Sequence, residues 1–74
     1  MDLCDVVPGR DVRVSALRSS AEVIRRLDAL GVSVGARMSV IRRRGGDVIV
    51  MACGVRYAIG RNIARSIVVA EDDA

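Results

Sequence analysis

Apolar and polar residues follow two different periods along this chain, and the change of period marks one helix among strands. Across residues 12–17 apolar side chains alternate with polar ones, which is the period of a half-buried strand. The next apolar residues are Val23, Ile24, Leu27 and Leu30, which lie on one face of a helix. The alternation returns after position 36. The pattern therefore predicts one helix that packs against a small sheet.

The bounds of this helix are predicted by the residues that flank it. Ser19 and Glu22 have the spacing of a capping box, in which a hydroxyl and a carboxylate bond to free backbone N–H groups. Gly31 follows the last apolar residue and is suited to the left-handed conformation that ends a helix. A second glycine, Gly35, leads into the next strand. We expect a helix capped by Ser19 and stopped at Gly31.

The remaining pattern predicts four further strands. Pro8-Gly9 is a good central pair for a type II turn, and Gly45-Gly46 for a hairpin turn. Residues 48–53 are apolar at every position, which is typical of a central strand covered on both faces. The predicted strands cover residues 12–17, 37–43, 48–53, 55–59 and 66–70, with one helical turn at 61–65 that points Ile63 or Ala64 inward.

Five short strands with a helix between the first and second predict a mainly β fold. A sheet of this size exposes its edges unless it curls. The economical solution is a small SH3-like barrel, formed by residues 1–74 as a single domain with a disordered acidic tail at 71–74. An OB-like barrel is the rival, but it places its helix after the third strand.

The amino-acid composition restricts the possible functions of the protein more than it restricts the possible folds. The chain has no His, Phe or Trp, and Tyr57 is its only aromatic residue. The two cysteines, Cys4 and Cys53, stand far apart without ligand-like neighbours, so we expect reduced thiols. No apolar run is long enough to span a membrane, and the first residues lack a basic signal-peptide region. We expect a soluble, cytoplasmic protein.

The chain offers little for catalysis or metal binding. It has no histidine, no nucleophile beside a plausible base, and no phosphate-binding glycine loop. We therefore expect no catalytic residues, no metal ligands and no cofactor. Arg42-Arg43-Arg44, at the predicted hairpin, suggests either a solvated turn or contact with RNA or an anionic membrane. Single-strand binding needs stacking aromatics, and Tyr57 alone does not supply them.

Several short motifs occur along the chain in a characteristic order and spacing. They are Leu3, Pro8-Gly9, Arg26-Leu27, Leu30-Gly31, Gly35, Val40, Gly46-Asp47, Val48, Ala58-Ile59, Ala64, Ile67 and Val69. Together they resemble the FeoA family, small SH3-like proteins encoded with the FeoB ferrous iron transporter. The same domain occurs at the C-terminus of DtxR-type repressors. The chain departs from the family at Val34, where proline is usual, and in its short hairpin. Its length resembles that of the stand-alone protein.

The resemblance implies a non-catalytic accessory protein of ferrous iron uptake that binds the cytoplasmic part of FeoB. Leu27 lies at the centre of the apolar stripe that Val23, Ile24, Leu27 and Leu30 form on the helix, so we assign it to the core. We expect partner contact on the stripe's flank and outer side, at Ile24, Arg25 and Asp28. Such a protein is cytoplasmic and is recruited to the inner face of the membrane by its partner. The alternatives are a small basic barrel that binds nucleic acid and a metal-sensing accessory domain, and the oligomeric state stays open.

Overall fold

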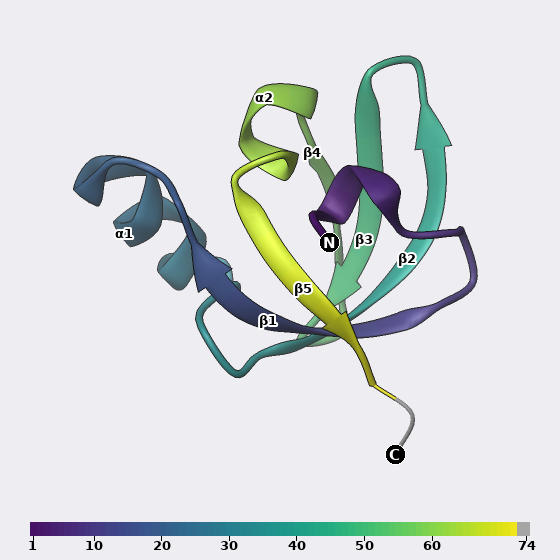
Figure 1. Cartoon of the computed structure of the whole chain (residues 1–74), viewed down its shortest axis with the longest axis horizontal. Coiled ribbons are helices and arrows are strands. Elements are labelled where there is room, and N and C mark those ends of the chain that lie inside the picture. Colours follow the sequence, from purple (N-terminus) through teal and green to yellow (C-terminus); the bar gives the residue numbers. More distant parts are fainter. Residues whose placement is uncertain (73–74) are drawn as a thin grey trace.

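One strongly curled antiparallel sheet of five strands organises the chain (Figure 1). The computed structural model describes residues 1–72. The strand order is β4-β3-β2-β1-β5, so the first strand lies inside the sheet and the fourth and fifth lie at its edges. This is the predicted SH3-like barrel. The strands are β1 (Asp11–Leu17), β2 (Arg37–Arg44), β3 (Asp47–Ala52), β4 (Val55–Ile59) and β5 (Ile67–Glu71).

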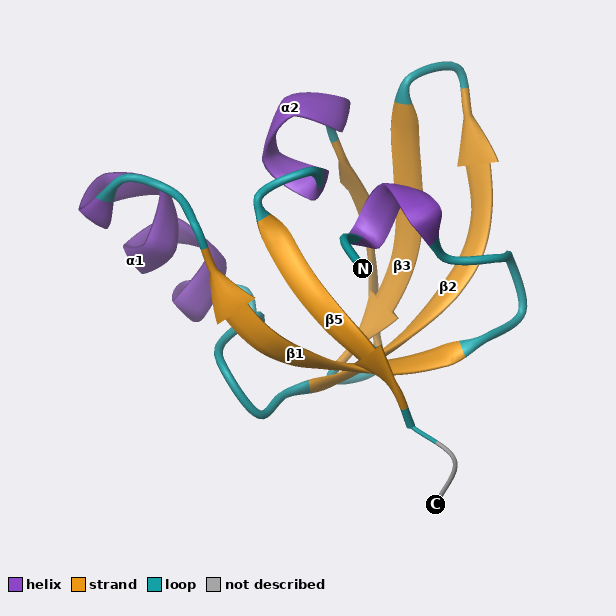
Figure 2. Cartoon of the chain, in the orientation of Figure 1, coloured by secondary structure: helices purple, strands orange, loops and turns teal. Residues whose placement is uncertain are grey.

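In the described residues, three helical segments connect or cover these strands (Figure 2). The longest, α1 (Ala21–Ala29), lies between β1 and β2 in sequence, as predicted. A single turn, α2 (Arg61–Ala64), joins β4 to β5 and points Ala64 into the core, whereas Ile63 stays partly exposed. A 3₁₀ helix, η1 (Leu3–Asp5), precedes the first strand.

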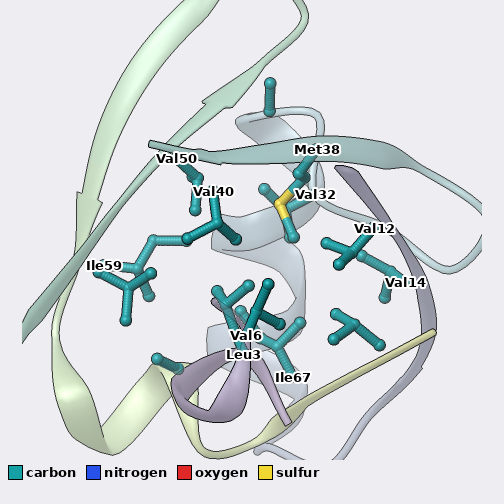
Figure 3. Packing of buried hydrophobic residues seen from close by; sticks show 14 of the residues in the cluster. Leu3, Val6, Val12, Val14, Val32, Met38, Val40, Val50, Ile59 and Ile67 are labelled. Carbon is teal, nitrogen blue, oxygen red and sulfur yellow. The ribbon is translucent and has the colours of Figure 1, made fainter. Parts of the chain in front are cut away.

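The core is built almost wholly from aliphatic side chains on the inner face of the curled sheet (Figure 3). Val12 and Val14 of β1 are buried, as their alternation predicts, and so are Ile67 and Val69 of β5. Tyr57 packs against this cluster from the side and stays partly exposed. A core of small branched residues suits a tightly curled sheet, because such side chains fill its narrow interior without large rings.

The N-terminal segment closes the mouth of the barrel, which the sequence pattern did not predict. Leu3 is fully buried and Val6 nearly so, and both lie close to Ile67 in Figure 3. The carbonyl of Met1 accepts a hydrogen bond of 2.9 Å from the N–H of Val69. The outer edge of β5 is therefore paired with the start of the chain, which protects it from pairing with other molecules.

The predicted N-cap of α1 is wrong by one residue. Ser20 is the N-cap, and its Oγ accepts a hydrogen bond of 3.2 Å from the N–H of Val23. Ser19 instead bonds through its hydroxyl to that of Ser66, just before β5. The capping-box spacing was misleading because Ser19 and Ser20 are adjacent and either can cap. The partner of Ser19 lies across the fold, where local sequence carries no information about it.

The predicted disordered tail is also wrong for the part that the structure describes. Glu71 is the last residue of β5, and Asp72 is held by two arginines. The Asp72 Oδ2 atom lies 2.6 Å from Arg37 Nε and 3.2 Å from Arg13 Nη2, and this side chain is only 8% exposed. Residues 73 and 74 lie outside the described part of the chain. The ion pairs extend the ordered chain because Arg13 and Arg37 face each other on adjacent strands.

Four of the five strands differ from the prediction by one residue at one or both ends. β1 begins one residue earlier, at Asp11, and β2 ends one residue later, at Arg44, while β3 and β5 are each shifted as a whole. Strand β3 covers Asp47–Ala52 rather than 48–53, because Cys53 has a φ of +52° and belongs to the turn before β4. Strand β5 begins at Ile67 rather than Ser66, whose hydroxyl donates to the carbonyl of Ile63 in α2. Neither shift changes which side chains face the core.

Candidate functional site

Helix α1 is held against the barrel mainly by one side chain and by its C-terminal end. Leu27 is only 4% exposed, and it is the one fully buried residue of the helix. On the solvent side, Arg26 Nη2 lies 3.1 Å from Glu22 Oε1 in an i, i+4 ion pair. The helix therefore presents two long flanks to solvent, one on each side of the Leu27 contact.

The end of α1 is a Schellman motif, which sets the position of the helix relative to the sheet. The N–H of Gly31 bonds to the carbonyl of Asp28 at 3.0 Å, and the N–H of Val32 bonds to that of Leu27 at 2.8 Å. Gly31 has a φ of +85°, so the predicted left-handed stop is confirmed. A Cβ at this position would lie 2.7 Å from Cys53 Sγ, so only glycine allows this close approach to the β3–β4 turn.

An apolar groove lies between α1 and the segment formed by β4 and α2. Its volume is about 190 Å³. Leu30 and Ile63, on its two sides, are each 38% exposed and are the most accessible of its large apolar side chains. Arg26 is the only charged residue in its wall. The groove is lined by Val23, Arg26, Leu27, Leu30, Ala58, Ile59, Gly60 and Ile63.

This geometry fits one or two aliphatic side chains of another molecule. The groove is open at the surface and its lining is mostly hydrocarbon. Filling it would remove Leu30 and Ile63 from water, and burial of apolar surface is the main favourable term in protein association. The arrangement is an apolar, surface-open concavity with two accessible aliphatic side chains on its sides.

The structure places the predicted contact residues on the other flank of α1. At 100° per residue, Val23, Arg26 and Leu30 lie on the groove side of Leu27. Ile24 and Asp28 lie on the opposite side of Leu27, and Arg25 lies on the outer surface between the two flanks. Ile24 is half-buried, and Arg25 and Asp28 are exposed. The structure therefore does not bring these three residues together with the groove.

Sequence reasoning missed the groove for an identifiable reason. Leu30 was assigned to the buried stripe because it continues the helical spacing, but it is the C-cap residue and is partly exposed. Ala58 and Ile63 come from elements about 30 residues further along the chain. The available signal was the choice left open between Ile63 and Ala64, since only one of them can point inward from a single turn.

The three consecutive arginines of the β2–β3 hairpin do not act as a unit. A β-bulge lies between Val40 and Arg42, which shifts the register so that Arg43 lies opposite the buried Val48. The Arg43 guanidinium donates to the carbonyl of Cys4 and, at 2.9 Å, to that of Val6. All three arginines are exposed, but among residues 1–72 the side chains of Arg42 and Arg44 form no hydrogen bond or ion pair. One of the three arginines is therefore structural.

Residues 1–72 contain no feature that supports a metal site or a membrane-spanning helix. No group of three or more His, Cys, Asp or Glu side chains there could hold a metal ion. Cys4 is half-buried and Cys53 is exposed, and both are free thiols. No helix in that part of the chain is both long and apolar enough to cross a bilayer.

Comparison with known proteins gives one consistent result. A family model described as the FeoA domain matches residues 1–71. A curated relative, the putative Fe(2+) transport protein A of Methanocaldococcus jannaschii, is 34% identical over 61 residues, which are 82% of this chain and 74% of the relative. The solution structure of FeoA from Chlorobium tepidum is 30% identical, with a TM-score of 0.89, over 96% of this chain and 70% of that one.

Two more distant structures are similar in fold. A zinc-complexed FeoA from Stenotrophomonas maltophilia, described as a prokaryotic SH3 domain protein, is 22% identical with a TM-score of 0.80, over 95% of this chain and 89% of that one. A manganese-dependent transcriptional repressor contains the same fold, at 24% identity and a TM-score of 0.84, but this chain covers only 41% of it. The SH3-like architecture predicted from the sequence is thus shared with both groups.

Proposed function

The chain belongs to the FeoA family, and on that premise we propose that it is a non-catalytic accessory protein of ferrous iron transport that binds the cytoplasmic part of a FeoB-type transporter. The relative from Methanocaldococcus jannaschii is named for Fe(2+) transport, which supports the iron context. In this role the protein is cytoplasmic and reaches the membrane surface through its partner. Iron is then cargo of the transporter and not a ligand of this chain.

The observation that carries the proposal is the apolar groove between α1 and the β4–α2 segment. A docking protein needs an accessible apolar surface that a partner can bury, and Leu30 and Ile63 supply it. Arg26 in the wall favours a partner with an acidic residue beside its apolar anchor, since opposite charges at an interface rim raise the rate and specificity of association.

The proposed interface also includes the contact residues predicted from the sequence, which lie on the outer surface of α1 and on its flank away from the groove. A partner that fills the groove and continues over the exposed surface of the helix meets Arg25 next. Beyond it lie Ile24 and Asp28 on the far flank. The groove then provides the apolar anchor, and these three residues provide surrounding contacts that set orientation.

A titration of this protein with the isolated cytoplasmic domain of the transporter from the same organism tests the proposal, with and without guanine nucleotide. We expect saturable binding that Leu30→Glu combined with Ile63→Glu weakens at least tenfold, because the anchor is lost and charge is placed in an apolar groove. The matched control is Val7→Glu combined with Val34→Glu. These valines are 62% and 64% exposed and lie outside the groove.

The outcomes separate the two flanks of α1. Loss of binding in the groove variant alone supports the groove as the anchor. Loss only in Ile24→Ser combined with Arg25→Glu moves the interface to the far flank and leaves the functional proposal standing. If none of the folded variants differs from the parent, α1 is not the docking element. Absence of any binding by the parent protein, in every nucleotide state, overturns the proposed partner.

A further inference from the structure

Strand β3 is apolar on both faces, and only one of these faces is inside the barrel. Val48, Val50 and Ala52 point into the core and are at most 2% exposed. Side chains alternate along a strand, so Ile49 and Met51 lie on the outer face. Both are half-buried. The sequence pattern alone predicted a covering element on that side.

The register of the sheet places an arginine beside each of these two side chains, on opposite sides of β3. Ile49 lies opposite Arg42 of β2, and Met51 lies opposite Arg56 of β4. Their other neighbours on this face are Ala58 and Ser39, and one carboxylate, Asp47, lies opposite Arg44. Residues directly opposite in an antiparallel pair share a face of the sheet. Arg44, two residues beyond Arg42, extends the same face towards the hairpin tip. We call this surface the basic sheet face: Arg42, Arg44, Ile49, Met51 and Arg56.

Within residues 1–72, no other helix or strand covers the basic sheet face. Figure 1 shows α1 on one side of the molecule and the β2–β3 hairpin on the other, so the helix cannot pack over the arginines of the hairpin. Arg42, Arg44 and Arg56 are all exposed. Among residues 1–72 none of these three guanidinium groups forms an ion pair or a side-chain hydrogen bond. Their charges are available to an external partner.

We propose that the basic sheet face binds the anionic headgroup surface of a lipid bilayer directly. The face has an apolar centre with Arg42 and Arg44 on one side and Arg56 on the other, so its three cations outnumber its one carboxylate, Asp47. This pattern suits a membrane interface, where the apolar groups enter the headgroup layer and the cations meet the lipid phosphates. The charge of the face is complementary to such a surface. This inference does not depend on the proposed transporter partner, because it concerns the isolated protein and lipid.

The shape and the chemistry of the face favour lipid over other anionic partners. The apolar groove, which suits the anchoring side chains of a protein partner, lies elsewhere, between α1 and the β4–α2 segment. The hollow beside Met51 is lined mainly by polar residues, among them Asp11, Arg37 and Ser39. Single-stranded nucleic acid needs stacking aromatics. The sole aromatic residue, Tyr57, lies opposite Val50, on the inner side of the sheet. A fluid bilayer needs neither a hollow nor a stacking platform.

The expected binding is weak and reversible. Each arginine at an anionic membrane surface raises the binding constant by about fivefold, so three raise it by roughly a hundredfold. A single surface of this strength does not hold a protein on a membrane permanently, and stable anchoring takes a second attachment. The basic sheet face would therefore orient the protein at the bilayer and leave it free to exchange.

Co-sedimentation with vesicles tests this inference on the whole protein. The probes are vesicles of equal parts phosphatidylglycerol and phosphatidylcholine, with vesicles of phosphatidylcholine alone for comparison. We expect binding to the anionic vesicles only, and we expect it to fall as salt is raised. The variant Arg42→Glu with Arg56→Glu should bind at least 25-fold more weakly. The matched control, Arg10→Glu with Arg65→Glu, carries the same net charge on other exposed surfaces and should stay within about threefold of the parent.

Each result either supports or contradicts lipid binding by the basic sheet face. No preference of the parent for anionic vesicles overturns the inference, and so does an equal loss in both charge variants, since net charge alone would then explain it. Met51→Ser, at a half-buried position, should also weaken binding if the apolar centre enters the headgroup layer. The same variants are titrated with a single-stranded RNA oligonucleotide. Tighter binding to RNA that needs Arg42 and Arg56 but not Met51 would assign the face to nucleic acid and overturn the lipid proposal.

Discussion

The guanidinium of Arg43 donates a hydrogen bond of 2.9 Å to the backbone carbonyl of Val6, across 37 residues of sequence. The same Nη2 atom also bonds to the carbonyl of Cys4. These two contacts hold the N-terminal segment, with its buried Leu3 and Val6, in the mouth of the barrel. The hairpin arginine therefore supports the core and does not belong to the basic surface beside it.

We predict that Arg43→Ala lowers the free energy of unfolding by about 1.5–3 kcal/mol, which is the usual contribution of hydrogen bonds to a charged group. Arg42→Ala should change it by less than about 0.5 kcal/mol, because the guanidinium of Arg42 forms no hydrogen bond or ion pair within residues 1–72. Denaturant melts of both variants provide the measurement. Equal effects of the two substitutions would show that the bulge does not distinguish these arginines in solution.

Ser20, rather than Ser19, should carry the helix cap. Ser20→Ala is expected to cost about 0.5–2 kcal/mol, because the N–H of Val23 loses its partner. Ser20→Asp keeps an acceptor at the helix start and should stay close to the parent. Chemical denaturation of the pair checks this. A cap assignment to Ser20 fails if the alanine and aspartate variants have the same midpoint.

Gly31 should tolerate no side chain, for two separable reasons. Its φ of +85° is unfavourable for other residues, and a Cβ would meet Cys53 Sγ at 2.7 Å. We expect Gly31→Ala to destabilise by at least about 1 kcal/mol. The loss of stability caused by Gly31→Ala should be smaller when Cys53→Ala is also present. The second substitution removes the clash with Sγ, whereas the cost of the positive φ remains. Thermal melts of the two single variants and the double variant measure this coupling, and strict additivity would remove the contact from the explanation.

Leu27 and Leu30 should differ sharply although both belong to the apolar stripe of α1. Leu27 is 4% exposed, so Leu27→Ala removes buried hydrocarbon and leaves a cavity, at about 2–5 kcal/mol. Leu30 is 38% exposed and borders the groove, so Leu30→Ala should cost less than about 1 kcal/mol while weakening partner binding. Stability curves and a binding titration on the same samples separate the two roles. Comparable destabilisation by both would place Leu30 in the core.

Asp72 should stabilise the sheet although it lies close to the chain end. Its carboxylate is 8% exposed and pairs with Arg13 and Arg37. Asp72→Asn leaves those guanidinium groups without a charged partner, and we expect a loss of about 1–3 kcal/mol. Glu71→Gln is the control, since Glu71 is exposed and should change stability by less than about 0.5 kcal/mol. A parental melting curve for Asp72→Asn would show that the ion pairs contribute nothing measurable.

Local chemistry was sufficient to predict the features that depend on neighbours in sequence. The alternation of Val12 and Val14 identified the inner face of β1, because side chains on a strand alternate whatever the strand packs against. Leu27 was identified as the anchor of α1 from helical spacing alone. Gly31 was identified as the helix stop because no other residue adopts its backbone conformation so readily.

The tertiary structure alone decided the features that join distant parts of the chain. These are the groove between Leu30 and Ile63, the contact of Arg43 with Val6, and the pairing of Asp72 with Arg13, which spans 59 residues. Each arises because a curled sheet brings together side chains whose local sequence is compatible with several environments. Periodicity tells which side of an element is apolar, but the surface that it meets is set by the register and curvature of the whole sheet.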